Sequence, residues 1–258
     1  MKVVDYAACS DAGRVRPNNE DSFGSFPDFG VWCVADGMGG GDDGEIASSS
    51  IIRMLGNALM SVRAESDRDL TLEERVSIIR EVANEASRWL KDRAQAVGSH
   101  VCGTTLVGVI VDAANRIAVF HVGDSRAYSL SGGKLERLTQ DHSFAEALHM
   151  RESKLPPQMR CAVLRAVGIE ESVDLDVSEH QCLAGDRIVL CSDGLTRMVP
   201  DAEIARVLAV ADETCSKQAN ALVSAANKAG GVDNVTVMVL RIGSVPPQEK
   251  TGMGIDAK

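Results

Sequence analysis

The apolar and polar positions in the first part of the chain predict three short strands. Residues 2–10 and Ser22–Phe26 have the composition of strands, and the polar segment Arg14–Asp21 between them is typical of a loop. Val31–Ala35 is an uninterrupted apolar run, which indicates a buried strand. The run ends in Asp36 and several glycines, so we expect the Asp36 carboxylate where the strand leaves the core. The glycines would let the backbone turn sharply and approach a ligand closely. An ordinary Asp-Gly turn is the alternative interpretation.

The next segment has the spacing of two long helices. Apolar residues recur at helical intervals over Glu45–Arg63 and again over Thr71–Ala96. Thr71 followed by Glu74 fits a capping box at the start of the second helix. We expect the two helices to pack as a pair over one side of a core.

Beyond these helices the pattern changes to short segments rich in β-forming residues, joined by turns at hairpin spacing. The predicted strands are Thr104–Val111, Arg116–Val122, Arg126–Leu130, Lys134–Leu138, Val173–Ser178, Arg187–Cys191 and Val235–Ile242, and the predicted helices are Asp201–Leu208 and Lys217–Lys228.

Residues 141–160 are irregular to weakly helical, and Pro156-Pro157 should break any helix there. Gly230-Gly231 should end the last helix as a C-cap. The order of the elements predicts an α+β fold in which helices cover antiparallel sheets. We expect one domain over residues 1–243 and a short disordered tail over residues 244–258.

Composition narrows the class of protein. The chain has 258 residues, 45% of them apolar and 25% charged, and a formal net charge of −10, which argues against a non-specific nucleic-acid binder. Its seven cysteines are odd in number and form no CxxC pair, so we expect reduced thiols in a cytoplasmic protein. No segment has the length of a signal peptide or a membrane span, so we expect no membrane association.

Acidic residues recur where apolar strands begin or end. Besides Asp36, these are Glu20, Asp21, Asp124, Asp193 and Asp233. Clustered carboxylates repel one another unless a positive charge compensates them. No histidine or cysteine lies at suitable spacing, so the natural compensator is Mg²⁺ or Mn²⁺, which prefer oxygen ligands. Calcium is less suitable because no EF-hand loop is present. Two such ions bridged by one carboxylate would activate a water and clamp a phosphoryl oxygen.

Arg16 lies four residues before Glu20. Its planar guanidinium suits a phosphate dianion, and a solvated surface arginine is the alternative.

Seven motifs together carry a resemblance to a known family. In chain order they are SDAGRVRPNNEDS, VADGMGG, CGTTL, HVGDSRAY, LTQDHS, LCSDGL and GGVDNVTV, from Ser10 to about Arg241. In this order they resemble the metal-dependent protein phosphatases, the PPM or type 2C serine/threonine phosphatases, in their bacterial style. The resemblance implies two antiparallel sheets packed face to face, with a pair of helices outside each sheet and the metal centre at one end.

The resemblance also implies a role for each motif residue. Asp36 would bridge two Mn²⁺ or Mg²⁺ ions, and Gly37 would bind one of them through its carbonyl. Asp193 and Asp233 would complete the coordination shell of the second ion. Glu20 would hold metal-bound waters, with Asp21 as its neighbour, and Arg16 would bind the substrate phosphate. A metal-bridging hydroxide would attack phosphorus in line and displace a seryl or threonyl alkoxide. No phosphoenzyme is implied, so the cysteines would not be nucleophiles.

Two positions depart from the family's pattern or leave a role open. Asp124 matches a ligand of a third, weaker metal, but Arg197 stands where many relatives have another aspartate, and its charge should weaken that third site. Met38 occupies the place of a histidine that animal relatives use as a proposed general acid, and methionine cannot donate a proton.

The segment that corresponds to the family's flap is residues 143–160, and it is shorter than in many relatives. For Met150, Leu155 and Met159 within it, packing and substrate contact are equally open. For His142, just before it, the alternatives are a catalytic role and a structural hydrogen bond.

These observations predict a protein serine/threonine phosphatase that acts on phosphoproteins and reverses a bacterial serine/threonine kinase. One alternative is a catalytically inactive phosphatase fold that binds phosphoproteins. Retention of Asp36, Asp193 and Asp233 argues against it, because an inactive site need not keep a costly acidic cluster. Another alternative is a hydrolase of small phosphate esters with the same fold.

Overall fold

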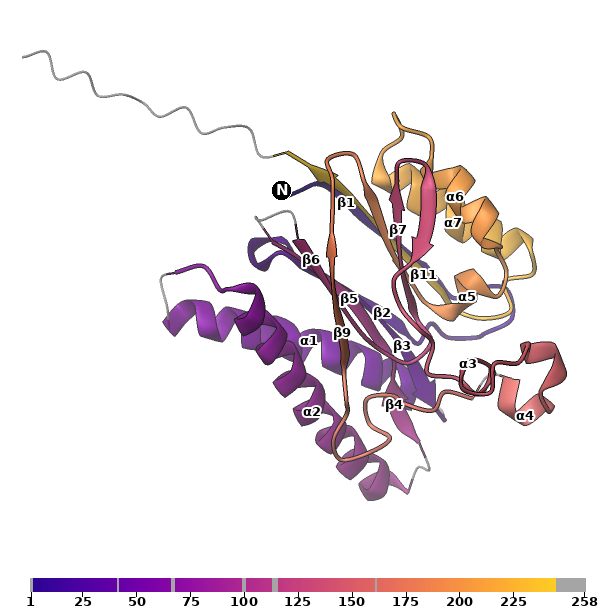
Figure 1. Cartoon of the computed structure of the whole chain (residues 1–258). Helices are drawn as coiled ribbons and strands as arrows, with labels where there is room; N and C mark the ends of the chain where they lie inside the picture. Colours follow the sequence, from indigo (N-terminus) through magenta and orange to yellow (C-terminus); the bar gives the residue numbers. More distant parts are fainter. Residues whose placement is uncertain are drawn as a thin grey trace, which may run out of the picture.

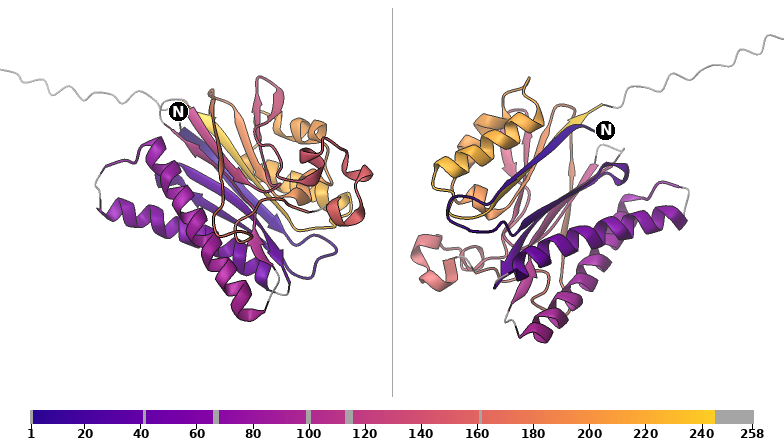
Figure 2. Two further views of the ribbon diagram at one scale, coloured as in Figure 1. Left: turned by 60° about the horizontal axis from the view of Figure 1, so that its bottom comes forward. Right: turned by 180° about the vertical axis from the view of Figure 1, so that it is seen from behind.

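Two antiparallel sheets face each other, and helices cover the outer face of each, so that the chain forms four layers (Figure 1, Figure 2). The computed structural model describes residues 2–40, 42–65, 68–98, 101–112, 116–160 and 162–244 of the 258. This arrangement confirms the predicted α+β class and the packing of two sheets between helix layers.

The first sheet has the strand order β1-β11-β10-β7-β8, and we call it the β11 sheet. Its strands are β1 (Lys2–Asp11), β7 (Arg126–Ser131), β8 (Lys134–Arg137), β10 (Arg187–Cys191) and β11 (Val235–Gly243). The last strand of the chain therefore lies inside the sheet, paired with β1 on one side and β10 on the other.

The second sheet has the order β2-β3-β5-β6-β9, and we call it the β3 sheet. Its strands are β2 (Asp21–Phe26), β3 (Val31–Gly39), β5 (Leu106–Val111), β6 (Arg116–Val122) and β9 (Asp176–Gln181), and β4 (Cys102–Thr104) pairs with the far end of β3.

The longer helices cover the outer faces, and the short ones lie in the segments that connect the other elements. The long helices are α1 (Asp43–Glu65) and α2 (Leu72–Val97) on the β3 sheet, and α6 (Asp201–Leu208) and α7 (Cys215–Lys228) on the β11 sheet. The short ones are η1 (Pro27–Phe29), α3 (Phe144–Ala147), η2 (Glu152–Lys154), α4 (Pro157–Arg160) and α5 (Asp193–Thr196). In Figure 1 the α3–α4 segment stands out from the sandwich at its lower right.

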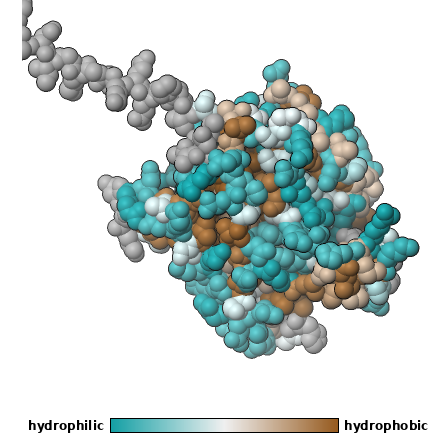
Figure 3. Space-filling view, in the orientation of Figure 1, coloured by the Kyte–Doolittle hydropathy of each residue, from teal (hydrophilic) through white to brown (hydrophobic). Residues whose placement is uncertain are grey.

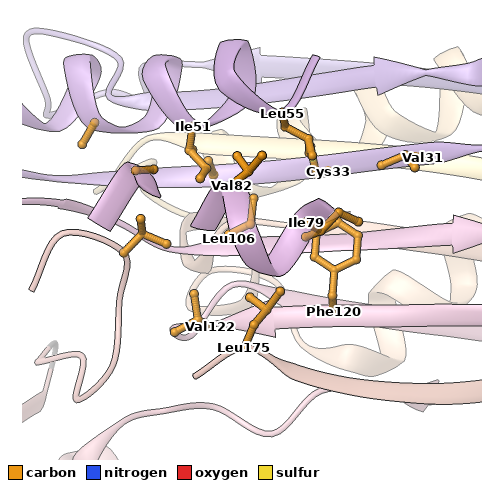
Figure 4. Close-up of a cluster of buried hydrophobic side chains, with 14 of the residues drawn as sticks. Val31, Cys33, Ile51, Leu55, Ile79, Val82, Leu106, Phe120, Val122 and Leu175 are labelled. Carbon is orange, nitrogen blue, oxygen red and sulfur yellow. The ribbon is translucent and has the colours of Figure 1, made fainter. Parts of the chain in front are cut away.

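Strand β3 shows why the sequence runs apolar without interruption. Val31 and Cys33 point to the core under α1 and α2, which Figure 4 shows together with Ile51 and Leu55 of α1. Trp32 and Val34 instead join the core between the two sheets. Both faces of the strand are thus buried, and alternation places the next even position, Asp36, on the side that faces the other sheet.

Several local predictions are confirmed. Thr71 caps α2, since its side chain accepts from Glu74 N–H while the Glu74 carboxylate accepts from Thr71 N–H. Gly132-Gly133 forms the tight turn between β7 and β8, with φ of 54° and 82°. The C-cap of α7 is Ala229 and not the predicted Gly230-Gly231, which follows directly after it, with Gly231 at φ of 53° and its N–H donating to the Ala226 carbonyl.

Strand β3 is longer than predicted, and the strand predicted at Thr104–Val111 is divided in two. β3 does not leave the core at Ala35 but continues to Gly39. Thr105 separates β4 from β5, because its N–H and its side chain are both used to hold the backbone of Asp36. Gly37 and Gly39 therefore continue the strand and make no sharp turn.

Two further predictions need correction. The strand predicted at Val173–Ser178 is formed by Asp176–Gln181 instead, because Val173 N–H donates to Asn84 of α2 and so is tied to the helix layer. The second proline of Pro156-Pro157 begins α4 and does not break it, since proline is tolerated in the first turn of a helix.

The predictions for the cysteines and the C-terminal tail can be compared with the structure only in part, because some of these residues lie outside the described ranges. Cys9, Cys33, Cys102, Cys182, Cys191 and Cys215 are free thiols, and Cys161 lies outside the described residues. So does nearly all of the predicted tail, residues 245–258. Among the helices in the described ranges, none combines the length and apolarity that crossing a bilayer requires.

Candidate active site

Asp21 and Asp36 lie directly opposite each other on the neighbouring strands β2 and β3. The backbone of Asp36 is fixed from the next strand. Its N–H donates to Thr105 Oγ1 at 3.0 Å, and its carbonyl accepts from Thr105 N–H at 2.8 Å and from Thr104 Oγ1 at 2.9 Å. The sheet thus presents a pair of carboxylates side by side on its inner face.

Three more aspartates reach the same place from other segments. Asp193 begins α5 directly after β10, Asp233 precedes β11, and Asp124 lies in the turn between β6 and β7. Burial raises the pKa of Asp36 well above its ordinary range, and the charges of Asp21, Asp193, Asp124 and Asp233 raise it further. The five carboxylates therefore form one cluster at one end of the inter-sheet core.

Two members of the cluster keep an unsatisfied buried oxygen. Asp21 accepts from Ser192 Oγ at 2.7 Å through one oxygen, while its Oδ1 has no hydrogen-bond partner, and burial raises its pKa to about 7. Asp124 Oδ1 also lacks a hydrogen-bond partner, and burial followed by the charge of Asp193 raises the pKa of Asp124 to about 7. Buried oxygens without donors, in a cluster that offers oxygen ligands, fit a hard divalent cation such as Mg²⁺ or Mn²⁺.

Glu20 and Gly37 lie beside these aspartates. Glu20 N–H donates to Asn234 Oδ1 at 2.8 Å, and its carbonyl accepts from Gly37 N–H at 3.1 Å. A Cβ on Gly37 would lie 2.1 Å from the carbonyl oxygen of Gly44, and one on Gly44 would lie 2.7 Å from the Glu20 carboxyl carbon. The glycines are needed for close approach, which places the Glu20 carboxyl against the first turn of α1.

Two arginines, Arg16 and Arg197, form ion pairs with acids of the cluster. Arg16 holds Asp233 with both arms of its fork, Nε to Oδ1 and Nη2 to Oδ2, each at 2.9 Å, and its side chain is half exposed. Arg197 Nη2 lies 2.7 Å from Asp193 Oδ2 and 3.7 Å from Asp124 Oδ2. The structure thus brings Arg16 and Arg197 to the cluster, where each compensates part of its negative charge.

Two connected hollows lead away from the cluster toward the α3–α4 segment. The first, of about 210 Å³, is lined by Asp124, Arg126, Asp141, Ser143, Asp193, Thr196 and Arg197. The second, of about 300 Å³, shares Arg126, Asp141 and Ser143 and continues along Ala145, Glu146, His149, Met150 and Arg151. We call the two together the flap groove.

The apolar residues of the flap divide between surface and interior. Leu148 and Met150 are 51% and 44% exposed, and Figure 3 shows apolar surface over this part of the molecule, at its lower right. Leu155 is buried, and Met159 is half-buried. Of the three positions left open between packing and substrate contact, only Met150 lines the flap groove.

Neither Met38 nor His142 is suited to transfer a proton at the acidic cluster. Met38 continues β3 opposite Gly103 and carries no proton to donate. The His142 ring bonds to Gly123, Asp176 and Arg165, and among the described residues it forms no hydrogen bond to a carboxylate of the acidic cluster.

Three polar residues hold the acids in place, and sequence reasoning gave them no role. Thr105 fixes Asp36, Ser192 donates to Asp21, and Asn234 ties Glu20 to the carbonyls of Ala12 and Asn18. All three occur in the motifs CGTTL, LCSDGL and GGVDNVTV, next to the residues that attracted attention.

Comparison with known proteins agrees with this geometry. The protein phosphatase 2C profile matches residues 14–226. The serine/threonine phosphatase stp of Listeria monocytogenes is 35% identical over 240 residues, which cover 90% of this chain and 93% of that protein. The solved structure of PppA, described as a key regulatory component of T6SS in Pseudomonas aeruginosa, is 33% identical with a TM-score of 0.81, over 93% of this chain and 98% of that one.

A further solved structure bears on the cofactor. The catalytic domain of the serine/threonine protein phosphatase PstP in complex with 2 manganese ions is 31% identical with a TM-score of 0.76, over 94% of this chain and 99% of that one. The chain therefore belongs to the protein phosphatase 2C family, as its motifs predicted. Within that family it is a metal-dependent protein serine/threonine phosphatase, an enzyme whose substrates are phosphoproteins.

Proposed function

We propose that the acidic cluster holds two Mn²⁺ or Mg²⁺ ions and is the place where phosphoserine and phosphothreonine are hydrolysed. In this proposal Asp36, the Gly37 carbonyl, Asp193 and Asp233 would hold the ions, and Glu20 would hold the water molecules of the ions, with Asp21 beside it. When bound, such ions supply an activated water and a clamp on the phosphoryl oxygens.

One observation carries the proposal. Both sheets contribute carboxylates to one buried cluster in which burial and neighbouring acids raise the pKa values of Asp21, Asp36 and Asp124, and two carboxylate oxygens lack a hydrogen-bond donor. Such an arrangement is costly for a protein that gains nothing from it, because like charges in a poorly solvated place oppose ionisation. A bound divalent cation would keep the acids ionised, because its charge would offset the repulsion among the carboxylates.

Arg16 is the proposed phosphate-binding residue. Its guanidinium already binds a carboxylate in a two-pronged geometry that a phosphate dianion matches equally well. Since the side chain is half exposed, an incoming phosphate can compete with Asp233 for the fork.

Direct hydrolysis is favoured over a cysteine intermediate. Cys33 and Cys191 are buried, and burial raises the pKa of each thiol to about 12, so neither supplies a thiolate near neutral pH. The flap groove supports a polypeptide substrate, because it extends from Asp193 to Met150 and can hold residues on one side of the phosphorylated one.

We further propose the setting in which the enzyme acts. Its substrates would be proteins phosphorylated by a cognate bacterial serine/threonine kinase, or the kinase itself, a proposal that relatives named serine/threonine phosphatases support. The free buried cysteines support a cytoplasmic location. The catalytic unit would be residues 1–243, and a third ion would bind weakly at most, because Arg197 lies between Asp124 and Asp193.

The test is hydrolysis of a phosphothreonine peptide by metal-stripped protein, before and after Mn²⁺ or Mg²⁺ is added back. We expect activity only with metal, and a higher kcat/KM for the peptide than for a small ester such as p-nitrophenyl phosphate. Silence with both ions in folded protein would support the phosphoprotein-binding module instead. A preference for the small ester would point to a hydrolase of small phosphate esters.

Arg16→Ala tests the phosphate contact. Loss of charged hydrogen bonds to the substrate should raise KM by about 10- to 100-fold. Arg14→Ala is the matched control, because Arg14 is an exposed arginine of the same loop. Equal KM values for the two variants would remove Arg16 from the proposed site.

A further inference from the structure

The dipeptide Asp141-His142 joins the two sheets where the chain enters the flap. Asp141 accepts from Arg126 of β7 in the β11 sheet, with Nε to Oδ1 at 2.9 Å and Nη2 to Oδ2 at 2.6 Å. His142 instead bonds to the end of β6 and to Asp176 of β9, both in the β3 sheet. The two neighbouring residues thus hold opposite layers of the sandwich next to the acidic cluster.

His142 is bonded twice to the residue that precedes Asp124. Its ring Nδ1 accepts from Gly123 N–H at 3.1 Å, and its own N–H donates to the Gly123 carbonyl at 2.9 Å. Gly123 has φ of +108°, and a Cβ there would lie 2.6 Å from Thr105 Cγ2. The turn that carries Asp124 therefore depends on a glycine backbone whose N–H is satisfied by the histidine ring.

The contacts of the ring decide its tautomer. With the proton on Nε2, Nδ1 accepts from Gly123 and Nε2 donates to Asp176 Oδ2 at 3.1 Å. With the proton on Nδ1, the buried Gly123 N–H loses its acceptor and Nε2 faces the Asp176 oxygen without a proton, while only Arg165 Nη1, at 3.0 Å, gains a partner. The first tautomer makes two hydrogen bonds and the second makes one, so the proton belongs on Nε2.

The same tautomer argues against a metal ion at this place. His121, His142 and Asp176 offer ligand atoms within 4.8 Å of one another, which would suit a cation. An Nε2 that carries the ring proton cannot be a ligand, and the guanidinium of Arg165 already lies 3.0 Å from it. The cluster is therefore better explained as a support.

We propose that His142 is a positioning residue for the active site: its unprotonated Nδ1 fixes the Gly123 turn and thereby places the Asp124 carboxylate beside Asp193 and Arg197. The inference rests on the proposed function of the acidic cluster. It gives this histidine, for which a catalytic role and a structural role were both open, a task that acts through the backbone.

Two substitutions at the same position separate the two ring nitrogens. In His142→Asn the amide oxygen can occupy the place of Nδ1 and accept from Gly123, whereas in His142→Gln the amide reaches toward the place of Nε2 and leaves Gly123 N–H without an acceptor. We expect kcat close to wild type for Asn and lower by about 10- to 100-fold for Gln, with KM little changed. Displacing the Asp124 carboxylate would disturb the contact that it shares with Asp193 through Arg197, and Asp193 is a proposed metal-binding residue.

His121→Gln is the matched control. His121 stacks on His142 with ring centroids 4.8 Å apart and is equally buried, but its Nε2 bonds to the Gln140 carbonyl and not to the Asp124 turn. This variant should keep wild-type kcat. A loss as large as that of His142→Gln would show that the ring stack is what matters and would overturn the proposal, as would equal kcat values for His142→Asn and His142→Gln.

A second measurement does not depend on activity or on the variants. In ¹⁵N-histidine-labelled full-length protein, the His142 ring should show an unprotonated Nδ1 and a protonated Nε2 at neutral pH. A protonated Nδ1 would refute the proposal even in an active enzyme. An inactive wild type with the expected His142 tautomer would instead count against the proposed function of the cluster.

Discussion

The two sheets contribute carboxylates of different character to the same cluster. Asp193 and Asp233, beside the strands of the β11 sheet, each form an ion pair with an arginine, Arg197 and Arg16. Asp21 and Asp36, from the β3 sheet, face each other across two strands, and no ion pair to either is found among the described residues. One half of the cluster is compensated by the protein itself, and the other half is not.

This difference indicates where an external cation is needed most. Burial and, after it, the charges of neighbouring acids raise the pKa values of Asp21 and Asp36, and neither carboxylate forms an ion pair within the described part of the chain. Beside the β11 sheet, Arg16 and Arg197 form ion pairs with Asp233 and Asp193, so they compete with any incoming metal ion for these carboxylates. The carboxylates of Asp21 and Asp36 in the β3 sheet should therefore contribute most of the affinity for metal. Asp193 and Asp233 beside the β11 sheet should contribute less, because each is already paired with an arginine.

The largest expected effect is on turnover, when one acid is removed from the β3 sheet or one from beside the β11 sheet. Asp36→Asn and Asp193→Asn should each lower turnover by about 1,000-fold or more, because each would weaken the proposed metal centre. Their effects on the metal-free protein should be opposite. Asp36→Asn relieves repulsion and should raise Tm by about 2–8 °C, whereas Asp193→Asn removes a partner of Arg197 and should leave Tm unchanged or lower.

Phosphopeptide hydrolysis and thermal melts of the metal-stripped variants measure both effects. Wild-type-like rates in Asp193→Asn would refute its role in the metal centre. The same change of Tm in both variants would remove the distinction between the two halves.

The pH dependence of stability should follow the acids whose pKa values are raised. Asp21 and Asp124 have folded-state pKa values of about 7 against an ordinary value of 3.8, so between these values the folded metal-free protein binds more protons than the unfolded chain. Its stability should therefore fall as pH rises through this window, by at most about 1.4 kcal/mol for each unit by which a pKa is raised.

Thermal melts of metal-stripped protein from about pH 5 to about pH 8 measure the trend. Asp21→Asn should make the profile flatter, and saturating Mn²⁺ should abolish the fall. A metal-free protein that grows more stable over this range would contradict the assignment of raised pKa values.

The smallest expected effect concerns Arg197. Arg197→Asp replaces a cation between Asp124 and Asp193 by a further carboxylate, so an additional Mn²⁺ should bind about tenfold more tightly or better. Arg197→Gln is the control, since it removes the charge without adding a carboxylate, and it should give a smaller gain. Calorimetric titration with Mn²⁺ measures the change, and an unchanged titration would show that Arg197 does not limit metal binding.

Most of the fold could be predicted from the sequence, because burial on both faces leaves continuous apolar runs and the long helices carry strong periodicity. The candidate site was recognised from the order of seven motifs, whose acids the structure does bring together. Errors arose where tertiary contacts override local pattern. Thr105 interrupts a strand because it serves Asp36, and Val173 is withdrawn from β9 by Asn84.

Pairings between distant residues could not be predicted. Nothing in the local sequence indicates that Arg16 reaches Asp233 or that His142 accepts from Gly123, because both contacts depend on how the two sheets are placed. Arg197 was noticed as a departure from the family pattern, but its contact with Asp193 required the geometry of α5.

The position of β11 has a consequence for when the enzyme can first act. Among the described strands this one is synthesised last, yet it lies inside its sheet between β1 and β10, and it follows directly after the segment that carries Asp233. A nascent chain on the ribosome therefore has neither a partner for β1 nor its full set of acids until almost the whole domain has emerged. We therefore expect no dephosphorylation before β11 has emerged, and we expect a prematurely terminated chain that lacks β11 to be inactive rather than weakly active.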